Sequence, residues 1–124
     1  MTEIRISEDE VLSDVAQALG SRPDVRLWRQ NTGVGRGLHN PNHVIAFGVM
    51  GGGDLSGLVL VGGVGVRLEV ECKARDGRQR KSQVRFEAMI KEMGGVYLVA
   101  RSAVEATERL EAAIAAVKRR LHAG

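Results

Sequence analysis

The sequence predicts a single α/β domain spanning residues 1–124, with a mixed β-sheet flanked by helices in the order αββββαβα. Helical periodicity appears near the start, after residue 82 and at the end of the chain, and runs of β-forming residues lie between these segments. The middle strands are joined by a hairpin, whereas the last strand is reached through a helix, which makes the sheet mixed. A chain of 124 residues buries one core.

The first helix is predicted over residues 7–19. Ser7 followed by Glu10 has the form of a capping box, and Gly20 and Pro23 end the helix. Apolar residues recur between these limits at helical spacing: Val11, Leu12, Val15, Ala18 and Leu19.

Four strands are predicted before the second helix. Residues 25–31 alternate and form a short strand, and HVIAFGVM (43–50) forms another. The segment TGVGRGLHNPN (32–42) between them is rich in Gly and Asn and is predicted to be a loop. DLSGLVLV and VRLEVECK, separated by Gly62 and Gly63, predict a β-hairpin.

Two helices and a strand complete the prediction. GVYLVA (95–100) is the last strand, and it lies between helices over residues 82–93 and 102 to about 121. The apolar stripe of the first of these helices contains Phe86, Met89, Ile90 and Met93. The stripe of the second contains Val104, Leu110, Ile114, Val117 and Leu121.

Composition excludes several classes of protein. The hydrophobic fraction of 44% and charged fraction of 27% are typical of a globular domain. No apolar run is long enough to span a membrane and the N-terminal segment is acidic, so we expect a cytoplasmic protein. Cys72 is the only cysteine, which excludes an internal disulfide and a thiolate metal cluster. The net charge of +3 favours a polyanionic partner.

The register of the hairpin brings two acids together. If Gly62 and Gly63 form a two-residue turn, Asp54 lies opposite Glu71. One face of the hairpin is then apolar, and it contains Leu55, Gly57, Val59, Val61, Val64, Val66, Leu68 and Val70. The other face contains Asp54, Ser56, Leu58, Leu60, Gly65, Arg67, Glu69 and Glu71. If the register slips by two residues, Asp54 lies opposite Lys73 and Glu71 is diagonal to it.

Opposed acids on a strand pair indicate a cation site. Directly opposed Cβ atoms are about 5 Å apart, and like charges in that relation destabilise a sheet. Two carboxylates at this separation suit Mg²⁺ or Mn²⁺, which prefer oxygen ligands. Lys73 points to the same side, and Cys72 points to the apolar face, where it packs in the core. The alternative interpretation is that Asp54 is a strand-entry acid and that Glu71 and Lys73 face solvent.

These residues carry a resemblance to a known family. The segment from GGGDLSG to KEMGG (51–95) resembles the core of the virus-type replication-repair nuclease (VRR-NUC) domain, a branch of the PD-(D/E)xK nucleases. The upstream SEDEVLSDVAQALG and RLWRQNTG resemble the segments that precede that core, so the resemblance covers nearly the whole chain. It implies a restriction-endonuclease-like fold and a Mg²⁺- or Mn²⁺-dependent endonuclease that leaves a 5′-phosphate.

The resemblance also implies roles for individual residues. Asp54 and Glu71 match the two metal-binding acids, Lys73 the catalytic lysine and Gln83 the glutamine of the following helix. An acid on the first helix completes such a site, and Glu8 fits best, with Glu10 as the alternative. The family name calls for proline before the first acid, where this chain has Gly53; proline is not a ligand, so the site is unaffected.

Basic and polar residues near these motifs predict contacts with DNA. Arg29 and Asn31 match a segment near the site in relatives, and further cations crowd the stretch after Lys73: Arg75, Arg78, Arg80, Lys81 and Arg85. Phosphate contacts carry no sequence code, and aromatic residues are only 3% of the chain, so we expect selectivity for DNA shape. His39 and His43 lack a third partner and are not included in the site.

The resemblance to stand-alone phage and bacterial members implies a homodimer that acts on branched DNA, such as Holliday junctions or flaps. Symmetric cleavage of two strands needs two sites related by a twofold axis. Three alternatives stay open at the level of sequence: a non-catalytic DNA-binding module that keeps the fold, an interaction domain, and an RNase or restriction-like enzyme with the same chemistry.

Overall fold

The structure is a computed structural model, and it describes residues 6–30, 33–36, 44–47 and 53–123. In chain order the elements are α1 (Glu8–Gly20), β1 (Val25–Arg29), β2 (Gly33–Arg36), β3 (Val44–Phe47), β4 (Leu55–Val61), β5 (Val64–Cys72), α2 (Lys81–Glu92), β6 (Val96–Ala100) and α3 (Ala103–Ala123). This order contains one strand more than the sequence predicts.

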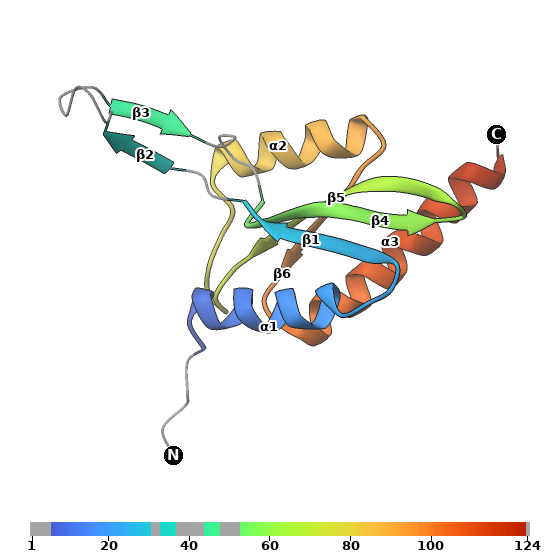
Figure 1. The fold of residues 1–124 in the computed structure, drawn as a ribbon, viewed down its shortest axis with the longest axis horizontal. Helices are drawn as coiled ribbons and strands as arrows, with labels where there is room; N and C mark the ends of the chain where they lie inside the picture. The colour runs from blue at the N-terminus through green and yellow to red at the C-terminus, as the bar shows by residue number, and fades with distance from the viewer. Residues whose placement is uncertain (1–5, 31–32, 37–43, 48–52, 124) are drawn as a thin grey trace, which may run out of the picture.

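The main sheet has four strands in the order β1-β4-β5-β6, and helices lie on both of its faces (Figure 1). β4 is antiparallel to both β1 and β5, whereas β6 is parallel to β5 because the chain reaches it through α2. α1 and α3 cover one face, and α2 lies on the other over β6 (Figure 1). The prediction of a mixed α/β sheet flanked by helices is confirmed.

The prediction of a loop over residues 32–42 is wrong for β2. Gly33–Arg36 pairs antiparallel with β3, and the two strands form a separate sheet that projects from the body (Figure 1). Gly33 and Gly35 lower the strand propensity of this segment, but the hydrogen-bonding partner supplied by β3 outweighs that preference. β3 therefore belongs to this small sheet, outside the main one.

The hairpin of β4 and β5 has the predicted two-residue turn. Val61 pairs with Val64 and Leu55 pairs with Val70, so the register is the one that places Asp54 opposite Glu71. Gly62 and Gly63 have φ values of 54° and 80°, the left-handed conformations that a type I′ turn requires and that glycine adopts without strain. The slipped register is excluded.

The core lies between the sheet and the pair α1 and α3. Its fully buried members come from both layers and include Val15, Leu19, Val59, Leu68 and Leu110. Cys72 is buried among them, as predicted. α1 covers the end of the sheet where β4 begins and β5 ends, and its first turn therefore lies close to the acids of the hairpin (Figure 1).

Several residues predicted to be buried are exposed, because each apolar stripe is longer than the surface it packs against. Val104 and Leu121, at the two ends of α3, are 68% and 41% exposed. Val64, next to the hairpin turn, is 45% exposed. Met89 and Met93 of α2 are also exposed, since this helix turns Gln83, Phe86 and Ile90 toward the sheet. None of the helices in the described part of the chain is long and apolar enough to cross a membrane.

Candidate functional site

The end of the hairpin brings together the two acids predicted from its register. Asp54 immediately precedes β4, and its Oδ2 accepts a hydrogen bond of 2.6 Å from the Cys72 backbone N–H. Glu71 is the penultimate residue of β5 and is fully buried. The two carboxylates therefore lie at the same end of β4 and β5, the two inner strands of the main sheet.

Glu71 has one satisfied and one unsatisfied carboxylate oxygen. Its Oε1 accepts hydrogen bonds from the Tyr97 hydroxyl at 2.7 Å and from Gln79 Nε2 at 3.1 Å. Its Oε2 is buried and accepts no hydrogen bond, which is true of no other buried side-chain nitrogen or oxygen among the described residues. Buried polar atoms without a partner are costly, so this oxygen is available to a ligand.

Lys73 lies beside this oxygen. Its Nζ lies 3.4 Å from Glu71 Oε2, and its side chain is 9% exposed. The contact is an ion pair without hydrogen-bond geometry, so the lone pairs of Oε2 stay unused. The β5–α2 loop packs on the lysine, since Gly77 approaches its Cβ and Cδ closely. Lys73 thus faces the acids from a partly enclosed position.

The pKa of Asp54 is raised above its ordinary value, chiefly because burial disfavours the charged form. The Cys72 N–H acts in the opposite direction, the carboxylates of Glu8 and Glu71 raise the pKa further, and Lys73 lowers it. The field of Glu8 thus reaches Asp54. The backbone N–H of Glu10 donates to Ser7 Oγ at the N-cap of α1, a bond that does not involve the Glu10 carboxylate. Of the two candidate acids on α1, Glu8 is the one whose charge acts on Asp54.

A raised folded-state pKa makes the contribution of Asp54 to stability depend on pH. In the unfolded chain the carboxyl ionises near 3.8, and in the folded protein it ionises at higher pH, so the folded state binds more protons in between. Stability is therefore lost as pH rises through this window. We expect Asp54→Asn to become more stable relative to the natural chain as pH rises from 4 to 7, measured as the difference in free energy of unfolding in urea. A difference that stays constant or falls with pH would contradict the burial of Asp54.

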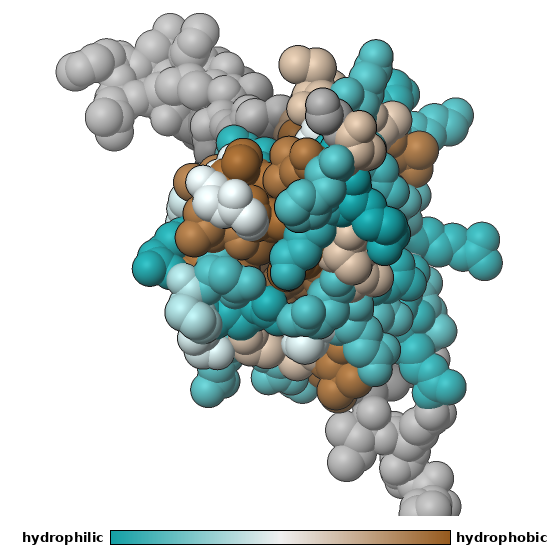
Figure 2. All heavy atoms as spheres, turned by 90° about the vertical axis from the view of Figure 1, so that its right-hand side faces the viewer, coloured by the Kyte–Doolittle hydropathy of each residue, from teal (hydrophilic) through white to brown (hydrophobic). Residues whose placement is uncertain are grey.

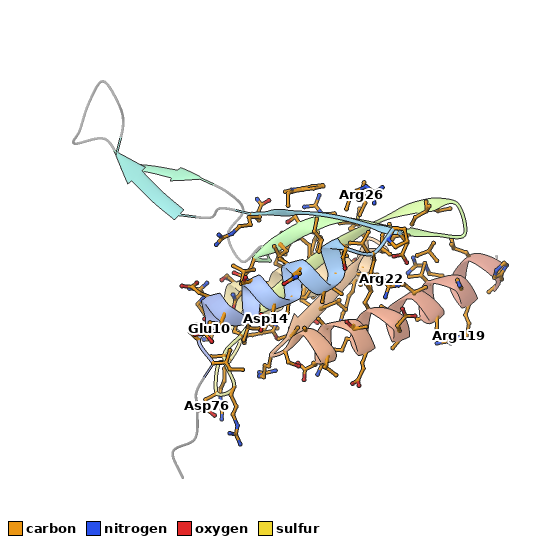
Figure 3. The ribbon with its side chains drawn as sticks, turned by 60° about the horizontal axis from the view of Figure 1, so that its bottom comes forward. Glu10, Asp14, Arg22, Arg26, Asp76 and Arg119 are labelled. Carbon is orange, nitrogen blue, oxygen red and sulfur yellow. The ribbon has the colours of Figure 1, made fainter. Side chains whose placement is uncertain are left out.

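The β5–α2 loop and the start of α1 lie side by side. Figure 3 shows Asp76 of the loop beside the first turn of α1, which carries Glu10, and the same neighbourhood is visible in Figure 1. Glu8 is exposed at this point, one residue after the N-cap Ser7. The fold therefore places the first helix acid, the two strand acids and Lys73 at one end of the sheet.

Cys72 takes no part in this chemistry. Its side chain is fully buried in the core, and burial together with the carboxylates of Asp54, Glu8 and Glu71 raises the pKa of its thiol to about 12. A thiol with this pKa is protonated at neutral pH and is a poor nucleophile. The residue contributes packing and its backbone N–H.

A second buried acid, Glu69, fixes the turn that carries Asp54. Its carboxylate accepts hydrogen bonds from Gly53 N at 3.1 Å, from Ser56 Oγ at 2.8 and 2.9 Å, and from the Arg67 guanidinium. A Cβ on Gly53 would lie 2.9 Å from Glu69 Oε2 and from Val70 O. A proline there would meet these atoms and lose the N–H donor, which explains why this chain has glycine before its first acid.

Gln83 is buried, as its predicted position toward the sheet requires. Its Oε1 accepts a hydrogen bond of 2.8 Å from the Arg80 backbone N–H, so the side chain caps α2. The helix cap is therefore one demonstrated role of this residue. It fixes the first turn of α2 beside the loop that follows Lys73.

The predicted DNA-binding cations differ in position. Arg75, Arg78, Arg80, Lys81 and Arg85 are all exposed on the β5–α2 loop and the first turns of α2. Arg29, the last residue of β1, pairs with Leu55 next to Asp54, and it lines a cavity of about 490 Å³ together with Asp9, Leu12, Ser13 and Ala16. Asn31, His39 and His43 lie outside the described residues.

Two contacts of Glu71 were not predicted from sequence. Tyr97 is 4% exposed, and burial followed by its bond to Glu71 raises the pKa of its phenol, so the hydroxyl stays protonated and donates. A hydroxyl in the buried strand VYLVA needs a partner, and this need was a signal for its role. Gln79 bridges Glu71 and Glu87 from a loop, and nothing in its sequence context indicates this contact.

The donor set fits a hard divalent cation. In the described ranges no three His, Cys, Asp or Glu side chains gather into a complete metal site, so a cation here would use Asp54 and Glu71 and fill its other positions with water or substrate oxygens. A cation here would give Glu71 Oε2 the ligand bond that no hydrogen-bond donor provides, and it would add to the positive charge of Lys73 beside the half-buried Asp54.

Comparison of the chain with protein-family models, curated proteins and solved structures finds no match.

Proposed function

We propose that this protein is a Mg²⁺- or Mn²⁺-dependent, structure-selective DNA endonuclease of the VRR-NUC type, with a restriction-endonuclease-like core. The observation that carries the proposal is the buried, unpartnered Oε2 of Glu71, opposite Asp54 and 3.4 Å from Lys73 Nζ. A sheet built only for stability has no use for a buried carboxylate oxygen without a donor. A metal-dependent nuclease requires one.

Each residue of the site has a role in phosphodiester hydrolysis. The bound cation would polarise the phosphate and supply a hydroxide at neutral pH. Asp54 and Glu71 hold it, while Tyr97 and Gln79 fix the Glu71 carboxylate by binding its other oxygen. Lys73 neutralises the charge that develops on the phosphate oxygens. Glu8 adds negative charge at the open side of the site.

The exposed cations of the β5–α2 loop and the start of α2 follow Lys73 directly along the chain. They bind the phosphates that flank the scissile bond. Such contacts hold the substrate in register without reading its bases. We propose branched DNA as the substrate and a homodimer as the active form. Two sites related by a twofold axis then cut two strands symmetrically.

The proposal is tested with a panel of labelled substrates. Purified protein is incubated with four-way junctions, flaps, linear duplex, single strands and RNA, each with Mg²⁺, Mn²⁺ or EDTA. We expect metal-dependent cleavage of a branched DNA that leaves 5′-phosphate ends. Cleavage that continues in EDTA, or no cleavage of any substrate with either metal, would overturn the proposal.

Calorimetry separates the enzyme from a non-catalytic DNA-binding module with the same fold. We expect heat of binding when Mn²⁺ is titrated into the natural protein and none with the Asp54→Asn, Glu71→Gln double variant. A module that only binds DNA has no need of the ion and would give no heat in either case. Light scattering on the same purified protein measures its mass in solution, and we expect the mass of two chains.

A further inference from the structure

One face of the main sheet is only partly covered. α2 packs over β6, and the same face of β1 and β4 carries exposed apolar side chains: Trp28 is 50% exposed, Leu58 45% and Leu60 56%. Figure 2 shows apolar side chains gathered on this part of the surface, beside α2. Exposed large apolar residues that lie together mark a binding surface more often than chance. Trp28 is also the only tryptophan of the chain.

Trp28 lies next to the candidate metal site. It pairs with Ser56, which in turn pairs with Glu69, so the three side chains form one row across the sheet. Gln30 lies two residues after Trp28, just past the end of β1, and its backbone N–H donates to Asp54 O at 2.9 Å. Trp28 is therefore about 6.6 Å along the strand from the level of Asp54. Its indole stands on the same face of the sheet as the side chains of Ser56, Glu69 and Glu71.

The next row of the sheet carries positive charge. Arg26 pairs with Leu58, which pairs with Arg67, so two guanidinium groups flank an apolar residue beside Trp28. Arg26 donates to the backbone carbonyls of Pro23 and Val25, which are uncharged partners, and Figure 3 shows it pointing away from α1 and α3. Arg67 is 48% exposed, although it also binds Glu69.

We propose that Trp28 is a stacking platform for an unpaired base of a single-stranded DNA segment, with Arg26 and Arg67 binding its phosphates. An exposed indole offers a π-face to any base, and cations beside it suit the sugar–phosphate chain. The platform would favour flaps and other branched substrates with a single-stranded segment over continuous duplex, because they present unpaired bases beside a duplex. This inference rests on the proposed function for its choice of nucleic acid as ligand.

The charges decide between DNA and a second copy of the chain as the occupant. Interfaces between proteins place opposite charges together, and like charges that meet across an interface are unfavourable. Here the apolar residues alternate with Arg26 and Arg67 across neighbouring strands, so burial against an identical surface would bring arginines of two copies together. Single-stranded DNA suits both kinds of residue, because its bases pack on the apolar side chains and its phosphates bind the arginines.

The single tryptophan makes the inference measurable. Oligothymidylate is titrated into the natural chain in EDTA, so that no cleavage occurs, and tryptophan fluorescence is recorded. We expect saturable quenching, and no quenching by an abasic oligonucleotide of the same length, which has the phosphates without the bases. Binding is measured in parallel by anisotropy of a labelled oligonucleotide. Trp28→Ala is expected to weaken it by about 5- to 100-fold, whereas Trp28→Phe keeps most of the affinity.

Val104→Ala is the matched control, since Val104 is an exposed apolar residue at the start of α3, on the other side of the sheet. We expect its oligonucleotide affinity to equal that of the natural chain. Equal quenching by the abasic strand, or unchanged affinity in Trp28→Ala, would overturn the inference. A second result would also overturn it: a change in tryptophan fluorescence that depends on protein concentration without any oligonucleotide and that is lost in Leu60→Ala. That result would show that a second copy of the chain covers this surface.

The test is independent of catalysis. If Glu71→Gln binds and is quenched as the natural chain is, while neither protein cleaves DNA with metal, the proposed nuclease activity fails and the base platform stands. If the natural chain cleaves branched DNA but shows no base-dependent quenching, the nuclease proposal stands and the platform fails.

Discussion

Glu71→Gln is expected to reduce metal-dependent cleavage by at least about 100-fold and to leave the protein folded. Glutamine keeps the shape of the side chain and an oxygen that accepts from Tyr97 and Gln79, so the contacts at Oε1 survive. At the other end an amide NH₂ replaces Oε2, the unpartnered oxygen proposed to bind the cation. The measurement is the single-turnover rate on the best branched substrate at saturating Mn²⁺, with circular dichroism as the check on folding.

Glu87→Gln is the control for this experiment. Glu87 is the other acid that Gln79 Nε2 contacts, at 3.0 Å, and it belongs to α2. The same exchange of oxygen for NH₂ at this position disturbs Gln79 without touching the proposed ligand. We expect Glu87→Gln to keep most of its activity. A folded Glu71→Gln protein with the natural rate would show that Glu71 does not bind the catalytic metal.

The part of the site that could be predicted from sequence is the part set by local rules. The Gly62–Gly63 turn and the alternation of apolar residues fix the hairpin register, and that register alone places Asp54 opposite Glu71. The roles of Tyr97 and Gln79 depend on longer-range geometry. Tyr97 pairs with Glu69 in the parallel ladder and reaches Glu71 diagonally, and parallel register is set by the α2 crossover, which no local pattern specifies.

The fold was predictable to a similar extent. The helices and the strands of the main sheet follow from periodicity, whereas β2 was missed because its glycines have low strand propensity and its only support is its pairing with β3. The apolar stripes of α2 and α3 were predicted, but the exposure of the residues at the ends of these stripes was not. Whether Val104 or Leu121 is buried depends on where the sheet beneath the helix ends, and a helical period carries no information on that.

Gly57→Ala is expected to destabilise the protein by about 3 kcal/mol or more. A Cβ on Gly57 would lie 1.8 Å from the Arg26 carbonyl oxygen and 2.9 Å from the Arg26 carbonyl carbon, so β1 must separate from β4 to accommodate it. The separation also weakens the bond between Gln30 N–H and Asp54 O, which ties β1 to the site. Urea unfolding measures the loss, and DNA cleavage is expected to fall with it.

Gly65→Ala separates this steric effect from the general cost of replacing a strand glycine. Gly65 lies in the same hairpin, has no positive φ, and a Cβ there would meet no heavy atom within 4 Å. Alanine at such a position reduces the entropy of the unfolded chain, so we expect a gain of up to about 1 kcal/mol. If the two variants unfold at the same urea concentration, β1 does not approach β4 at Gly57 as closely as the structure places it. The neighbourhood of Trp28, Gln30 and Asp54 then changes with it, because all three positions depend on that approach.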